Sequence, residues 1–94
     1  MGYYLNGGSL GSDNKTRTLV EDYGAIEYAF CPKWQDIHPG NALVIVKENG
    51  LFDAAALIYS QTELEAFTDP SDTRPTHILL MDKKIAHEMC GYKE

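Results

Sequence analysis

The sequence lacks the long apolar runs and the leader that mark membrane and secreted proteins. Its 94 residues are enough for one domain with a single core. No apolar stretch approaches the ~20 residues that a membrane-spanning helix needs. Residues 1–5 have neither a basic region nor an apolar run, so no secretory signal is predicted. We therefore expect a cytoplasmic protein that makes no contact with a membrane.

Basic side chains are also scarce. The sequence has 8 Lys and Arg against 14 Asp and Glu, a formal net charge of −6, and its longest basic run is Lys83-Lys84. Proteins that bind DNA or RNA depend on cationic contacts with phosphates, so direct nucleic-acid binding is disfavoured. The acidity fits either solubility alone or a basic protein partner, including a nucleic-acid-binding protein whose site the acidic face occupies.

Only two cysteines are present, Cys31 and Cys90. Without a secretory signal they are expected to be reduced thiols that are partly buried. With His38 and His87 they form one candidate set of zinc ligands, in which His87 and Cys90 are spaced to share a helix face. The step from Cys31 to His38 does not have the spacing of a tight zinc knuckle. We expect no metal, and a structural zinc protein is kept as an alternative.

The clearest structural signal is a pair of apolar segments in residues 42–59. The first is rich in β-branched residues, which favour strands, and Asn49-Gly50 between the segments is the strongest short-range signal of a β-hairpin. With these two residues as the turn, Val44 faces Ala55. Both faces are largely apolar, so we expect the hairpin to be central and covered by helices on at least one face. The alternative is a helical second segment, since alanine favours helix.

The later half of the chain predicts two helices and one more strand. Residues 60–68 and 82–90 are expected to be helical, because Ser60 begins a capping box and Asp82 is a good N-cap. The apolar segment 76–81 predicts an interior strand. The chain is therefore expected to form a single α+β domain with a small, mostly antiparallel sheet and the element order β-β-β-α-β-α.

The N-terminal part is less clearly patterned. A stretch rich in Gly, Ser and Asn at residues 6–16 predicts a flexible loop. Residues 17–24 remain open between helix and strand, because apolar side chains fit both periods. Gly24 favours a break there, followed by an extended segment in which Ile26 and Phe30 lie on one face.

Acidic and aromatic side chains form the first candidate functional surface. Residues 60–72 carry four carboxylates and no basic residue. Trp and Tyr are favoured anchors of protein interfaces, although they also dominate core burial. We expect a non-enzymatic protein-binding or regulatory module, with a homodimer through an exposed strand edge as one form of it. The expected interaction surface consists of Glu63, Glu65, Asp69, Asp72, Trp34 and Tyr92.

A pocket around Asp53, Cys31 and His38 is the second candidate. Asp53 interrupts an apolar strand, and a cysteine beside a histidine can become an activated thiol. This alternative describes a small enzyme or ligand-binding protein. Nothing in the sequence places the three groups together, so no residue is assigned as catalytic and no cofactor is expected.

Four short segments lie in the last third of the chain: 66–70 (AFTDP), 74–75 (RP), 79–83 (LLMDK) and 91–92 (GY). Together with one small acidic domain that has no enzyme motif, they resemble short open reading frames of bacteriophages and prophages. The resemblance carries over no active residues. It implies a small accessory or regulatory protein that works inside a bacterial cell.

Overall fold

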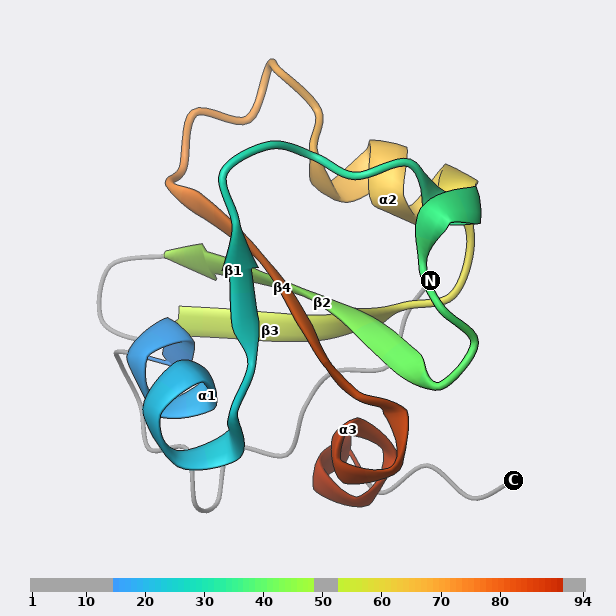
Figure 1. Cartoon of the computed structure of the whole chain (residues 1–94). Helices are drawn as coiled ribbons and strands as arrows, with labels where there is room; N and C mark the ends of the chain where they lie inside the picture. Colours follow the sequence, from blue (N-terminus) through green and yellow to red (C-terminus); the bar gives the residue numbers. More distant parts are fainter. Residues whose placement is uncertain (1–14, 49–52, 91–94) are drawn as a thin grey trace.

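Four antiparallel strands form the centre of the protein, in the order β1-β4-β2-β3 (Figure 1). The structure is a computed structural model that describes residues 15–48 and 53–90, without the side chains of residues 53, 54 and 90. Within these residues, three α-helices and the short 3-10 helix η1 surround the sheet, which confirms the predicted α+β class. The elements are α1 (Lys15–Tyr23), β1 (Ile26–Tyr28), η1 (Trp34–Asp36), β2 (Asn41–Glu48), β3 (Asp53–Ile58), α2 (Gln61–Phe67), β4 (Thr76–Asp82) and α3 (Lys83–Cys90).

The hairpin of β2 and β3 pairs two residues away from the predicted register. Val44 lies opposite Leu57 and Glu48 opposite Asp53, so the prediction that Val44 faces Ala55 is wrong. The last pair leaves four residues between the strands instead of two, and these lie outside the described part of the chain. Strand side chains alternate with a period of two, so this shift keeps each side chain on its expected face. β2 and β4 are interior strands, whereas β3 lies at one end of the sheet.

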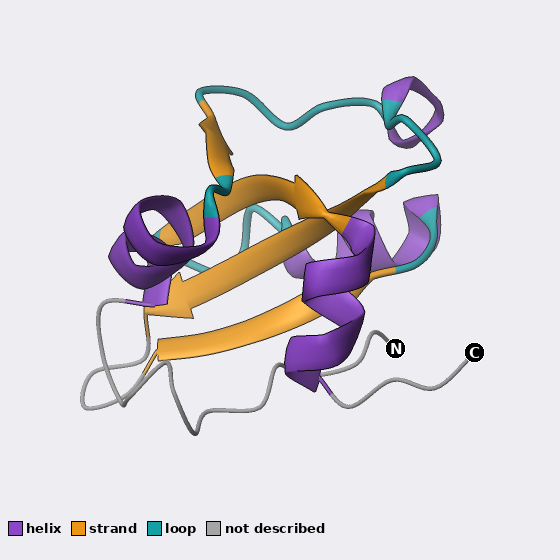
Figure 2. Ribbon diagram, turned by 60° about the horizontal axis from the view of Figure 1, so that its bottom comes forward, coloured by secondary structure: helices purple, strands orange, loops and turns teal. Residues whose placement is uncertain are grey.

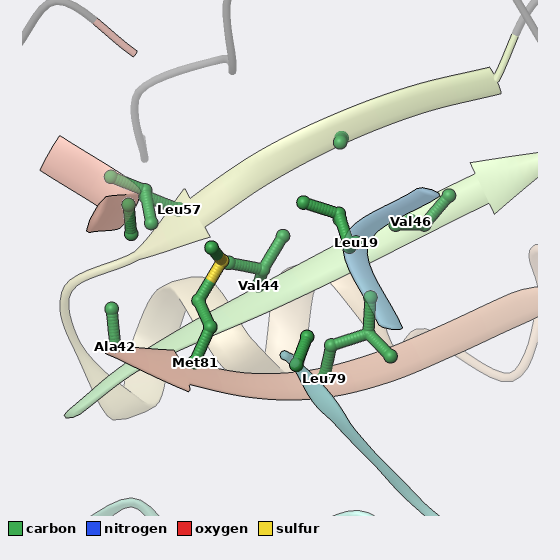
Figure 3. Packing of buried hydrophobic residues seen from close by; sticks show 10 residues of the cluster. Leu19, Ala42, Val44, Val46, Leu57, Leu79 and Met81 are labelled. Carbon is green, nitrogen blue, oxygen red and sulfur yellow. The ribbon is translucent and has the colours of Figure 1, made fainter. Parts of the chain in front are cut away.

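The two faces of the sheet are covered by different helices. Leu19 of α1 and Ala86 of α3 pack on one face, whereas Leu64 of α2 packs on the other. Figure 2 shows α3 and α2 on opposite sides of the sheet. Figure 3 shows Leu19 among side chains from β2 and β4, including Val44 and Leu79, all of which are buried. The sheet is therefore the middle of three layers.

Residues 15–23 form helix α1, which decides between the two interpretations left open for 17–24. The helix begins within the predicted 6–16 loop, so that prediction is wrong for its last two residues, and residues 6–14 lie outside the described part. Gly24 has a φ of 72°, a backbone conformation that favours glycine. There the chain turns into the extended segment that the sequence predicted after this residue, β1.

Both predicted N-caps are present. The hydroxyl of Ser60 accepts a hydrogen bond from the amide of Glu63 at 3.1 Å, and the Glu63 carboxylate reaches back to the amide of Tyr59 at 2.8 Å. The carboxylate of Asp82 accepts from the amide of Lys84 at 2.9 Å. The bonds from the amides of Glu63 and Lys84 satisfy helix amides that have no partner inside the helix. They place α2 and α3 within one residue of their predicted limits at each end.

Candidate functional site

A pocket of about 240 Å³ lies at the end of the sheet where β2 begins and β3 ends. η1 and the loop after it contribute one side of the pocket, and the first two turns of α3 contribute another. Lys83 and His87 are four positions apart on α3, so they share one helix face. We call this cavity the η1 pocket and define it by Trp34, Ile37, His38, Tyr59, Lys83 and His87.

The loop between η1 and β2 holds His38 in a defined orientation. Nδ1 of His38 accepts a hydrogen bond from the Gly40 amide at 2.9 Å, so in the neutral ring the proton is on Nε2. A Cβ on Gly40 would lie 3.2 Å from this Nδ1, and glycine therefore permits the close approach. The carbonyl of Gly40 also accepts from the Lys83 amide at 3.1 Å. This bond joins the segments that carry His38 and Lys83.

The lining of the η1 pocket is apolar and aromatic with basic groups. The rings of Tyr59 and His87 lie 5.9 Å apart between centroids, with an interplanar angle of 30°. His87 is buried, whereas His38 and Lys83 are exposed. Although the chain has 14 acidic residues, none of the described lining residues carries a carboxylate. The pocket is a basic site on an acidic protein.

A second cluster lies on the face covered by α1, where His77 of β4 links carboxylates of two neighbouring strands. Its Nδ1 is 2.7 Å from Oε2 of Glu27 on β1, and its Nε2 is 2.9 Å from Oε1 of Glu48 on β2. Partial burial lowers the pKa of His77, but hydrogen bonds to both glutamates and their negative charge outweigh it, so the pKa is raised above 6.5. The cluster therefore favours the positively charged ring.

An open hollow of about 360 Å³ lies beside this cluster and is lined by α1. Its acidic side chains already have partners within the protein. Glu27 and Glu48 contact His77, and Glu21 forms an exposed ion pair with Arg17 at 3.1 Å. Each of these carboxylates therefore contacts a basic side chain, but the three carboxylates outnumber the two basic groups.

Lys47 of β2 is a buried lysine whose charge is compensated within the fold. Its side chain is 5% exposed, and Nζ lies 2.8 Å from the hydroxyl of Thr76 and 3.4 Å from the carboxylate of Asp72. The guanidinium of Arg74 contacts the same carboxylate at 2.7 Å. Hydrogen bonds from the side chain and backbone of Arg74, with one from Lys47, hold the pKa of Asp72 well below its usual range. The Asp72 carboxylate therefore compensates the positive charge of the buried Lys47.

The four carboxylates of the predicted interaction surface lie on α2 and in the loop after it. Each accepts a hydrogen bond from the protein: Glu63 from the backbone, Glu65 from the side chain of Gln61 at 3.3 Å, Asp69 from the Ser71 amide at 2.8 Å, and Asp72 from Arg74. The bond from the Ser71 amide lowers the pKa of Asp69. Each of the four carboxylates therefore has a hydrogen-bond partner within the protein.

Trp34, the aromatic member of that surface, lies beside α2. Its backbone amide donates to the side chain of Gln61 at 3.2 Å, and its half-buried ring packs against the core together with Ile37. The structure therefore brings Trp34 to the helix that carries two of the predicted carboxylates. Tyr92, the remaining member, lies outside the described residues.

The predicted pocket of Asp53, Cys31 and His38 is not assembled. Cys31 is exposed rather than partly buried, and its thiol donates to the carbonyl of Pro32 at 3.6 Å. Asp53 begins β3 at the hairpin connection, whereas His38 lines the pocket at the opposite end of that strand. The direction of the hairpin therefore separates them. Among the described residues, no three His, Cys, Asp or Glu side chains come together as a metal site.

Sequence reasoning missed Tyr59 and Lys83 in the η1 pocket and the bridging role of His77. Two signals in the sequence bear on them. Lys83 and His87 have the four-residue spacing of one helix face, and His77 is a titratable residue directly before the apolar run of β4. Neither signal identifies the partners, which come from other elements.

The two ends of the sheet differ in exposure. Ala55–Ile58 of β3 are at most 3% exposed, although β3 is an end strand. At the other end, Ile26 of β1 is 64% exposed, and Phe30 just after it is 84% exposed. β1 pairs with β4 on one side only among the described strands. We call residues 26–30 the β1 edge: among the described strands nothing pairs with the outer side of β1, and two large apolar side chains are exposed on β1 or just after it.

No helix among the described residues is long and apolar enough to cross a membrane. Comparisons of the chain with protein-family models, curated proteins and solved structures each found no match.

Proposed function

We propose that the protein is a non-enzymatic binding module that pairs with an extended segment of a protein partner along the β1 edge. The observation that carries the proposal is the exposure of Ile26 on the end strand and of Phe30 two residues after that strand ends. Exposed apolar side chains that gather in one place are typical of interaction sites. An added strand also satisfies the outward backbone groups of an edge and gains affinity from main-chain hydrogen bonds.

The charge of the protein favours a basic partner. Glu21, Asp22 and Glu27 are exposed within or just before β1, and the net charge of the chain is −6. Opposite charge speeds encounter and selects against acidic competitors. We therefore expect a partner strand with apolar residues at alternate positions and Lys or Arg between or beside them. An accessory role of phage type, inside a bacterial cell, belongs to the same proposal and rests on the sequence resemblance.

The test compares three forms of the full chain as bait in bacterial lysate. Phe30→Ser removes the most exposed side chain of the edge, and Val20→Thr removes another exposed apolar side chain, on α1, as the matched control. A partner that pairs with β1 is retained by the wild type and Val20→Thr and lost by Phe30→Ser. Amide hydrogen exchange on the purified complex is expected to show new protection in residues 26–30.

Equal capture by all three forms overturns the proposal, as does a complex without new protection at the β1 edge.

Sedimentation of the purified chain tests the homodimer with the same three forms. A dimer through this edge is abolished by Phe30→Ser and unchanged in Val20→Thr. If the wild type is monomeric and captures no protein, both the proposed partner and the proposed homodimer are contradicted.

A further inference from the structure

The η1 pocket has no part in the proposed pairing, because none of its described lining residues belongs to β1. It is built by segments distant in sequence. The Gly40 carbonyl and the Lys83 amide, 3.1 Å apart, join the loop after η1 to the start of α3. The Gln61 side chain accepts from the Trp34 amide and joins η1 to α2. The pocket is therefore held together by the fold rather than by one loop.

The chemistry of the lining is that of a site for an anion with an apolar body. Lys83 and His38 supply donors, and Lys83 forms no ion pair with any carboxylate in the part of the chain that the structure describes. Apart from Asn41 and His87, the remaining lining is apolar or aromatic, with Trp34, Leu57 and Ile58 among its residues. Small-molecule sites commonly combine apolar walls with a few polar groups that orient the ligand.

The size of the pocket limits the ligand to about one ring. Its volume is about 240 Å³, which is below the ~300–1,000 Å³ of sites for drug-sized molecules. An apolar cavity of about 150 Å³ accommodates benzene. The η1 pocket therefore has room for one six-membered ring and a short arm that ends in a charged group.

We propose that the η1 pocket binds a small aromatic carboxylate, with its ring against Trp34 and the ends of β2 and β3 and its carboxylate at Lys83 and His38. Nε2 of His38 carries the proton in the neutral ring, because Nδ1 accepts from Gly40, and it can therefore donate to the ligand. Lys83 supplies a charge-assisted hydrogen bond, which is stronger than a neutral one.

Trp34 is the only tryptophan in the chain, so its fluorescence reports directly on this pocket. The probe is phenylacetate, and phenylacetamide is its neutral counterpart of nearly equal shape. We expect a saturable change with phenylacetate, half-complete below about 1 mM for a ligand of this size. Phenylacetamide is expected to bind at least about tenfold more weakly, because it loses the charge-assisted contact.

Two lysine variants locate the charge that holds the ligand. Lys83→Gln removes a lining charge and is expected to weaken phenylacetate binding at least about fivefold. Lys84→Gln removes the neighbouring exposed charge, which does not line the pocket, and is expected to change binding less than about twofold. Backbone amide NMR shifts on titration are expected to concentrate at Asn41, Tyr59 and Lys83.

Several results overturn the proposal. The first is the absence of saturation at about 10 mM phenylacetate, which leaves no useful affinity for such a ligand. If phenylacetate and phenylacetamide bind equally well, or if Lys83→Gln and Lys84→Gln lose the same affinity, Lys83 does not hold the carboxylate. Shifts that concentrate away from the pocket place the ligand elsewhere. Unchanged thermal unfolding of the variants separates loss of binding from loss of fold.

Discussion

Nδ1 of His77 lies 2.7 Å from Oε2 of Glu27, although the two residues are 50 positions apart in the chain. The other ring nitrogen lies 2.9 Å from Glu48, so the imidazole on β4 joins side chains of both neighbouring strands, β1 and β2. β1 has only three residues, and its pairing with β4 supplies few hydrogen bonds. The contact with His77 is therefore a second attachment for the strand that carries the proposed binding edge.

The first prediction is that stability falls as pH rises through the raised pKa of His77. The folded protein binds this proton more tightly than the unfolded chain, so the contribution is complete below about 6.5, the ordinary value, and is lost above the folded value. We expect the free energy of unfolding in urea to fall by up to about 1 kcal/mol between about pH 6 and pH 8.5.

His77→Asn is expected to remove most of this dependence, and His38→Asn is the matched control. His38 is exposed whereas His77 is half-buried, and the His38 ring contacts a backbone amide instead of a carboxylate. The control is expected to keep the fall in stability. A wild-type profile that is flat over this range, or an equal fall in His77→Asn, contradicts the assignment.

The second prediction concerns the buried Lys47. Asp72→Asn leaves the ammonium group without its carboxylate and is expected to lower the midpoint of urea unfolding. Lys47→Met replaces the charge with an apolar side chain of similar length and is expected to cost less than about 1 kcal/mol, because a buried ion pair is often no more stabilising than good packing.

The double variant provides the control for this pair. If Asp72 stabilises the fold chiefly by compensating Lys47, then Asp72→Asn adds little further loss in the Lys47→Met background. Full additivity of the two changes in urea unfolding counts against this role. Asp69→Asn, in the same loop, is expected to have a smaller effect, since the exposed Asp69 carboxylate accepts from the Ser71 amide and not from a buried lysine.

The third prediction concerns the N-cap of α2. Ser60→Ala removes the acceptor for the Glu63 amide and is expected to reduce the free energy of unfolding by about 1 kcal/mol. Ser60→Asp keeps an acceptor and is expected to retain most of the stability. Thr62→Ala, at an exposed position of the first turn, is expected to change it by less than about 0.5 kcal/mol. Thermal unfolding distinguishes these cases, and equal effects of Ser60→Ala and Thr62→Ala rule out the cap.

The fourth prediction concerns the end of α1. Gly24→Ala is expected to cost about 1 kcal/mol, because the φ of 72° is unfavourable for a residue with a Cβ. A Cβ at this position would meet no atom within 4 Å, so the penalty comes from the backbone alone. Gly24→Asn is expected to cost less, since Asn tolerates this region. Equal urea midpoints for wild type and Gly24→Ala contradict the assignment.

Local patterns predicted most of the elements. The cap at Asp82 and the β-branched residues of β2 act over a few neighbouring positions, and they placed α3 and β2 within one residue of the observed limits. The helix–strand choice at 17–24 stayed open because Leu19 and Tyr23 fit a helix while the residues after Gly24 alternate. Each pattern corresponds to an element of the structure, because helix α1 ends at Tyr23 and strand β1 begins at Ile26.

Other features depended on contacts that local patterns do not encode. The turn residues predicted a hairpin but placed Val44 opposite Ala55 instead of Leu57, because the length of the connection sets the register. The predicted capping box already gave Glu63 a backbone contact, which it makes with the Tyr59 amide. No local pattern predicted that Asp72 contacts the buried Lys47.

The sequence by itself determined an acidic α+β protein, its main strands and the caps of two helices, because composition, alternation and capping are properties of neighbouring residues. Only the tertiary structure decided that Glu27 and Glu48 meet His77 and that Trp34 lies in one pocket with Lys83. These contacts require β4 to insert between β1 and β2 and α3 to pack near η1. Strand order and helix packing follow from burial of the whole core, so residues far apart in the chain become neighbours only when the fold is complete.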